Sequence, residues 1–194
     1  MNLEINDALI PGTKLKKYDM GNVTGMEFLS KVFYISEGVM LSQIREVSGI
    51  DGSTLQNWTK RGWVANARLK KYNIDQVAHI LIINMLRSCI QLDHIAFLLQ
   101  YINGKIDDKS DDIIRDSVLY DYICRILETL TRQDVASKAS IKEVIREQIA
   151  SYEEAMEGAR DRLANALEII VTAYYAALIK RSSDEMLAAL MSSY

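Results

Sequence analysis

The chain has 194 residues, of which 49% are hydrophobic and 25% are charged, and its formal net charge is −3. This composition is typical of a soluble globular protein and excludes an intrinsically disordered one. No apolar run approaches the roughly 20 residues of a membrane span, and the N-terminus lacks the pattern of a signal peptide. We therefore expect a cytoplasmic protein with no membrane contact, whose Cys89 and Cys124 stay reduced.

Charge is distributed unevenly along the chain. Residues 38–90 carry a net charge of +4, which leaves −7 on the remainder. Residues 53–71 contain no acid at all and five bases, namely Lys60, Arg61, Arg68, Lys70 and Lys71. A solvated surface usually mixes charges of both signs, so a surface of one sign indicates a polyanionic partner.

The first predicted elements are an N-terminal arm and a helix. Residues 1–24 have little pattern beyond a turn at Pro11-Gly12, and their role stays open. Thr24 can cap a helix over residues 25–36, which carries apolar residues at helical spacing.

Residues 41–62 predict a helix-turn-helix. The first helix begins near Leu41 and ends at Gly49, because glycine enters the left-handed region without steric cost. Ser53 or Asp51 caps the second helix, which Gly62 ends. Its buried side carries leucine and tryptophan, while its outer side presents amides and cations, the groups that read base edges and hold phosphates.

A short β-hairpin follows, in which Trp63-Val64 pairs with residues 68–72 to make a wing. A strongly apolar helix then starts at Asn73 or Asp75, and another covers residues 93–103. The aspartate-rich link after it marks a domain boundary near residue 106.

The rest of the chain predicts a helical bundle, with helices over about 110–131, 137–157 and 159–180 and a short last helix capped by Asp184. The fold class is thus mostly α, and we divide the chain into an arm (1–24), a DNA-binding domain (25–105) and a dimerisation or effector domain (106–194).

Several motifs together resemble the MerR-type winged-helix domain over residues 38–103. In order, they are Ser48-Gly49-Ile50, Ser53-Thr54-Leu55 with Trp58, Lys60-Arg61-Gly62-Trp63-Val64, Lys71-Tyr72, and Asp75-Gln76-Val77 with Ile80. The whole chain is also similar to a group of uncharacterised bacterial proteins described only by a domain of unknown function with a MerR-like helix-turn-helix. The resemblance implies a winged helix and DNA binding.

The chain departs from the MerR pattern at three places. The family usually has arginine where Ser53 and Gln56 stand and tyrosine where Asn57 stands; Gln56 and Asn57 suit adenine better than guanine. The wing is shorter than usual. The family dimerises through one long C-terminal helix, whereas several helices are expected here, so its mode of dimerisation is not carried over.

We therefore expect a transcriptional regulator that is not an enzyme and needs no cofactor or metal. Its expected partners are double-stranded DNA and a second copy bound through the C-terminal helices, and a small-molecule effector is left open. The predicted DNA-binding residues are Ser42, Gln43, Ser53, Thr54, Gln56, Asn57, Lys60, Arg61, Arg68, Lys70, Lys71 and Tyr72.

Other features of the sequence suggest alternative functions. The runner-up is a protein-interaction module that turns the same basic surface toward an acidic protein. Asp107-Asp108-x-x-Asp111 matches a magnesium-binding pattern of all-helical prenyl-transferring enzymes, although the second motif of such enzymes is missing. The spacings of the histidines and cysteines match no zinc site, so His79, His94, Cys89 and Cys124 are expected in the core. The C-terminal tyrosines could line an effector pocket, the core or a dimer interface.

Overall fold

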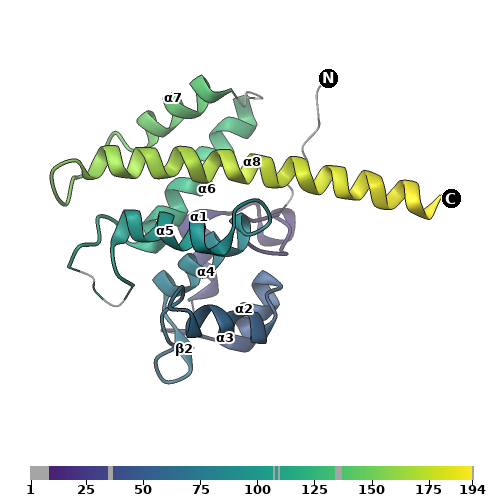
Figure 1. The fold of residues 1–194 in the computed structure, drawn as a ribbon, viewed down its shortest axis with the longest axis horizontal. Helices are drawn as coiled ribbons and strands as arrows, with labels where there is room; N and C mark the ends of the chain where they lie inside the picture. Colours follow the sequence, from purple (N-terminus) through teal and green to yellow (C-terminus); the bar gives the residue numbers. More distant parts are fainter. Residues whose placement is uncertain (1–8, 35–36, 107, 109, 134–136, 194) are drawn as a thin grey trace.

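The computed structural model describes residues 9–34, 37–106, 108, 110–133 and 137–193. The fold in this part of the chain is mostly helical, which confirms the predicted class at that level (Figure 1). In chain order the elements are η1 (Tyr18–Met20), α1 (Gly25–Val32), β1 (Val39–Met40), α2 (Leu41–Ser48), α3 (Gly52–Lys60), β2 (Lys71–Tyr72), α4 (Ile74–Leu86), α5 (Leu92–Asn103), α6 (Asp116–Gln133), α7 (Lys138–Gln148) and α8 (Ala159–Ser192).

Helix α4 lies at the centre, as its apolar sequence predicts. It packs against α2, α5, α6 and α8, and most of its residues are buried. Asn73 caps it by accepting a hydrogen bond of 2.9 Å from the Gln76 amide, while Gln76 Oε1 accepts the Asn73 amide at 2.9 Å. This capping box fixes where α4 begins and therefore where the loop before it ends.

The N-terminal segment crosses the side of α4. A Cβ atom on Gly12 would lie 2.2 Å from the Leu81 carbonyl oxygen, so only glycine allows this close approach. Asn84 Nδ2 donates to the Gly12 carbonyl at 2.8 Å and to the Ser48 carbonyl at 3.0 Å. Tyr120 Oη donates to the Pro11 carbonyl at 2.7 Å. Residues 9–14 are thus bound to α2, α4 and α6.

Helix α6 covers both α1 and α4, and a single cluster of buried apolar residues runs from Ile10 to Leu178. Thr24 Oγ1 donates to Glu128 at 2.6 Å, and the Met26 amide donates to Asp121 at 2.7 Å. Carboxylates of α6 therefore complete the N-terminus of α1. The parts on either side of residue 106 share one core.

The C-terminal helices differ in extent from those expected. Helix α6 begins at Asp116 rather than near residue 110, and α7 ends at Gln148 rather than Glu157. Helix α8 is continuous for 34 residues, so the expected break before a short last helix is wrong. No glycine or proline lies within it, and Lys180 pairs with Asp184 one turn on at 2.6 Å.

Helix α8 bears on the expectation that no segment of the chain is long and apolar enough to span a membrane. Among the described helices, it is long and apolar enough to cross a membrane by those two criteria alone. Its N-terminal half, however, packs against α4, α5, α6 and α7, and a core helix passes the same criteria. The C-terminal end extends beyond the body of the protein (Figure 1).

Candidate nucleic-acid interface

Helices α2 and α3 are joined by the tight turn that the sequence predicts. Gly49 ends α2 in the left-handed region with φ 73°, and Ile50 is buried behind it. Asp51, rather than Ser53, is the cap residue of α3, and the Ser53 hydroxyl donates to its carboxylate. The serine and the aspartate are both used, which resolves the alternative left open by the sequence.

Helix α3 buries one side and exposes the other. Leu55 and Trp58 are almost completely buried, and the Arg87 guanidinium lies 5.7 Å from the centre of the Trp58 ring. The outer side consists of predicted contact residues: Ser53, Gln56, Asn57 and Lys60 are exposed, and Thr54 is half-buried. At the start of α2, Ser42 and Gln43 are both exposed, and Gln43 Oε1 accepts the Met40 amide at 2.9 Å.

The predicted wing is built differently from the expected hairpin. Strand β2 pairs antiparallel with β1, so that Val39 faces Tyr72 and Met40 faces Lys71. The expected pairing of Trp63-Val64 with residues 68–72 is therefore wrong. Arg68 and Lys71 exchange two backbone hydrogen bonds of 2.9 Å and close a two-residue turn. We call residues 68–71 the basic turn.

The basic turn and α3 form an exposed cationic surface. Arg61 lies 5.0 Å above the Trp63 ring. None of the five bases between residues 53 and 71 makes an ion pair with another described residue, and all five are exposed. Tyr72 is buried, which raises the pKa of its phenol, so it supports the basic turn from beneath and does not present its side chain at this surface.

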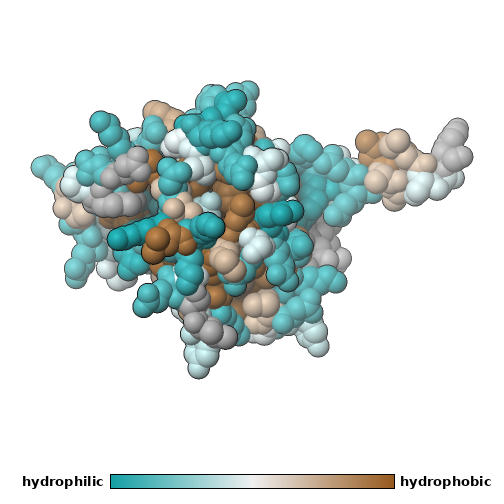
Figure 2. Space-filling model, turned by 90° about the horizontal axis from the view of Figure 1, so that it is seen from below, coloured by the Kyte–Doolittle hydropathy of each residue, from teal (hydrophilic) through white to brown (hydrophobic). Residues whose placement is uncertain are grey.

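Figure 2 views the protein from the end where α2, α3 and the basic turn lie in Figure 1. Hydrophilic residues dominate this face, with small hydrophobic areas between them. None of the five bases is engaged by a carboxylate of the described residues, so each keeps its attraction for phosphate.

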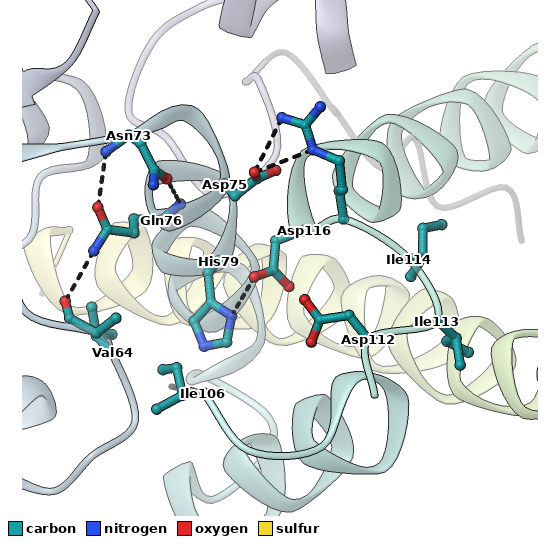
Figure 3. Close-up of a pocket in the computed structure, with 12 residues that line it drawn as sticks. Val64, Asn73, Asp75, Gln76, His79, Ile106, Asp112, Ile113, Ile114 and Asp116 are labelled. Atoms are coloured by element: carbon teal, nitrogen blue, oxygen red, sulfur yellow. Dashed lines mark hydrogen bonds and ion pairs between the residues drawn. The ribbon is translucent and has the colours of Figure 1, made fainter. Parts of the chain in front are cut away.

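A pocket of about 530 Å³ lies where α4 meets the segment that leads into α6 and the loop that follows α3 (Figure 3). We call it the junction pocket. Val64, Ala65 and Ile113 contribute apolar walls, and Asp112 and Asp116 contribute carboxyl groups. Because Val64 and Ala65 lie between α3 and the basic turn, the pocket adjoins the segment that connects these two elements.

His79 joins the elements around the junction pocket. Its Nδ1 lies 3.2 Å from Asp116 Oδ2 (Figure 3). Its Nε2 lies 2.9 Å from the Trp63 carbonyl oxygen, which can only accept. Asn103 Nδ2 donates to the other Asp116 oxygen at 3.3 Å. The sequence placed His79 in the core and gave no signal for this network, because Asp116 lies 37 positions farther along the chain.

The remaining candidate groups do not form a site among the described residues. Cys124 is buried, and burial raises the pKa of its thiol to about 12, whereas Cys89 and His94 are exposed, so their expected core positions are wrong. No group of three His, Cys, Asp or Glu side chains in the described chain is arranged to hold a metal. Of the magnesium-type motif, Asp107 lies outside the described residues. Tyr120 and Tyr152 donate to backbone carbonyls at 2.7 Å and belong to the core.

Comparison with known proteins gives one matching domain and one relative, and neither carries a described activity. Residues 28–123 match a family described as a domain of unknown function (DUF1836). Over 122 residues the chain is 31% identical to the uncharacterised protein YkrK of Bacillus subtilis (strain 168). The aligned region covers 61% of this chain and 51% of YkrK. The chain thus spans about half the length of that relative, and no solved structure matches it. Together these matches support an uncharacterised bacterial family, with residues 28–123 as the part that carries its domain.

Proposed function

We propose that this protein is a DNA-binding transcriptional regulator with a MerR-like winged helix-turn-helix. Helix α3 enters a major groove, where Thr54, Gln56 and Asn57 lie near base edges. Lys60, Arg61 and the basic turn hold phosphates. The observation that carries the proposal is the exposed surface of α3 and the basic turn. Its chain contains no acid between residues 53 and 71, and its five bases make no ion pair among the described residues.

The test begins with selection of bound duplexes from a random DNA pool by the full-length protein. An enriched motif establishes sequence-specific binding, and an inverted repeat reports a two-fold symmetric dimer. Affinity for the selected duplex is then measured by fluorescence anisotropy between about 50 and 200 mM salt.

Replacing Arg68, Lys70 and Lys71 together with alanine should weaken binding to every duplex. Each lost phosphate contact reduces the slope of log affinity against log salt concentration by about 0.9, so the slope should fall by roughly 2 to 3. The matched control replaces Arg132, Lys138 and Arg146, three exposed bases of α6 and α7 at the opposite end of the protein (Figure 1). An unchanged slope in the first variant, or an equal fall in the control, would contradict the proposed surface.

The alternative is that the same cationic surface binds an acidic protein and has no DNA target. Competition distinguishes the two. Binding to the selected duplex that survives an excess of an acidic protein, but not an excess of the same unlabelled duplex, supports DNA as the partner. If the acidic protein and the unlabelled duplex displace the labelled duplex at similar concentrations of negative charge, the protein-interaction module is favoured.

We also propose that two copies pair through α8. Ile169, Ala176, Ile179, Met186 and Leu190 recur along it at heptad spacing and are accessible. Its N-terminal half borders an open groove of about 940 Å³, lined by apolar residues that include Ile90 and Ile141. The projecting end of α8 has exposed hydrophobic residues (Figure 2). An antiparallel pair would place each projecting end in the groove of the partner, a self-complementary arrangement.

The junction pocket is the place that we assign to a small-molecule effector. A ligand there would contact Val64 and Ala65, and so bear on the connection between α3 and the basic turn. The carboxyl groups of the pocket outnumber its one guanidinium, Arg115, which already pairs with Asp75 at 3.1 Å.

A further inference from the structure

The tip of the basic turn is a leucine in an unusual position. Leu69 is 91% exposed, and it stands between Arg68 and Lys70. Leu69 and Lys70 both have backbone φ angles in the left-handed region, at 50° and 64°. Two-residue turns of this type usually carry asparagine, aspartate or glycine, because side chains such as leucine are strained there.

Nothing in the described chain compensates for the leucine. Its side chain is not covered by any other element, so it gains no burial, and its backbone is strained. The turn would close at least as well with Asn-Gly at the same two positions. Leu69 is strained and exposed at a position where a better turn former would fit. A contact with a partner outside the chain would account for a leucine there.

The base of the turn is held firmly. Arg68 and Lys71 are joined by two hydrogen bonds of 2.9 Å, and β2 is paired with β1 directly before α2. Gln76 Nε2 donates to the Asn66 carbonyl at 2.9 Å, which ties the approach to the turn to the start of α4. Figure 1 shows the loop that contains the turn extending beyond α3 at the same end of the protein. The leucine is therefore presented on a supported tip.

We propose that Leu69 is a wedge that enters the minor groove of duplex DNA beside the major groove occupied by α3. This inference rests on the proposed function and deepens it. The interior of a minor groove offers sugar rings and stacked base edges, while phosphates line both of its rims. An apolar tip ringed by Arg68, Lys70 and Lys71 matches that pattern, and apolar side chains in minor grooves unstack a base step and bend the duplex.

Two variants of the same turn separate the wedge from the turn geometry. Leu69→Asn removes the apolar side chain, and Lys70→Asn removes a cation from the neighbouring position. Asparagine tolerates the left-handed region in both, so each variant should raise the melting temperature of the full-length protein, by roughly 2 °C. Any difference between the variants on DNA then reports the leucine side chain itself.

The measurement uses the full-length protein and the duplex selected above, with 2-aminopurine placed in turn at each adenine. Wild type and Lys70→Asn should raise the fluorescence at one step per half-site, because that step unstacks. Leu69→Asn should lose this signal and bind about tenfold more weakly. Its salt slope should stay that of the wild type, whereas Lys70→Asn should lose about one unit of slope.

Each other outcome overturns the wedge. If the wild type selects and binds a duplex but Leu69→Asn unstacks it equally, the wedge is wrong and the proposed function stands. If the wild type binds no duplex, the proposed function fails with it. A cationic loop with an apolar tip also suits an anionic membrane. Binding to phosphatidylserine vesicles that Leu69→Asn abolishes, with no unstacking of DNA, would assign the tip to lipid instead.

Discussion

Asp75 belongs to α4 but secures the start of α6. One of its carboxylate oxygens accepts the Ser117 amide at 3.1 Å and the Ser117 hydroxyl at 2.6 Å, and the other accepts the Arg115 guanidinium at 3.1 Å. Burial alone would raise the pKa of Asp75. The hydrogen bonds from Ser117 and the pair with Arg115 outweigh burial and lower the pKa below its ordinary value of 3.8.

Asp75→Asn should lower the free energy of unfolding at pH 7 by about 2 kcal/mol, because the hydrogen bonds lose their charged acceptor. A carboxyl group whose pKa is depressed in the folded state stabilises the protein above its unfolded pKa. This contribution disappears as the pH falls through the folded pKa. Urea unfolding should therefore show a full difference between wild type and variant above about pH 5, and a shrinking difference below the ordinary pKa of 3.8.

The matched control for this prediction is Asp93→Asn, an exposed acid in the first turn of α5. Its substitution should change the free energy of unfolding by less than about 0.5 kcal/mol. A difference for Asp75→Asn that stays constant from pH 7 to the acid range would contradict the assigned role of its charge.

Cys89 and Cys124 show how far the local sequence predicts whether an individual side chain is buried. Both lie in apolar stretches, yet Cys124 is buried in α6 and Cys89 is exposed in the turn after α4. Helical periodicity placed Cys124 correctly. It could not place Cys89, because α4 ends at Leu86 and the regular alternation of faces ends with it.

At the scale of elements, α8 combines two roles in one helix. Its first half is a core helix, and its second half exposes Met186, Leu187, Leu190 and Met191. Burying large apolar side chains contributes about 1.5 to 3 kcal/mol each, so this end gains stability only by meeting a partner surface. The proposed pairing of two copies supplies that surface.

Leu187→Glu combined with Leu190→Glu should convert a dimer of the full-length protein into a monomer, because two charges would have to be buried in the groove of the partner. Sedimentation velocity measures the change. Ala188→Glu combined with Ser192→Glu adds the same charges on the opposite side of the helix and should leave the dimer intact. A wild-type protein that is monomeric at all concentrations tested would rule out the pairing.

At the scale of the whole molecule, α6 packs against helices on both sides of the boundary predicted near residue 106. It covers α1 and α4, and the family match runs from Phe28 in α1 to Ile123 in α6, across the boundary predicted near residue 106. A shared core couples the stability of the two parts, because removing buried atoms from one face exposes or loosens the other.

Ile123→Ala tests this coupling, since Ile123 is fully buried in α6. The only two tryptophans, Trp58 and Trp63, both lie in the predicted DNA-binding part, so their fluorescence follows its unfolding. We expect the tryptophan and far-ultraviolet transitions of the variant to shift together, with a loss of about 2 to 5 kcal/mol. The exposed control Arg132→Ala should shift neither. An unshifted tryptophan transition in Ile123→Ala would show two independent domains.

The sequence by itself determined the helical class, the turn between α2 and α3, and the exposed cations of α3. These features depend on glycine conformation, on helical periodicity and on local charge, all of which act between near neighbours in the chain. The capping box of α4 is of the same kind. The turn and the capping box each depend on a few consecutive residues, whereas the helical class depends on the same local patterns repeated along the chain.

Only the tertiary structure decided which strand pairs with β2, how α6 covers α1 and α4, and how His79 meets Asp116. These contacts join residues more than 30 positions apart, and many alternative pairings satisfy the same local pattern. The special position of Leu69 is recognised only from the sequence and the structure together. Its apolar side chain among bases is visible in the sequence, but its left-handed backbone and full exposure follow from the way that β2 is held against β1.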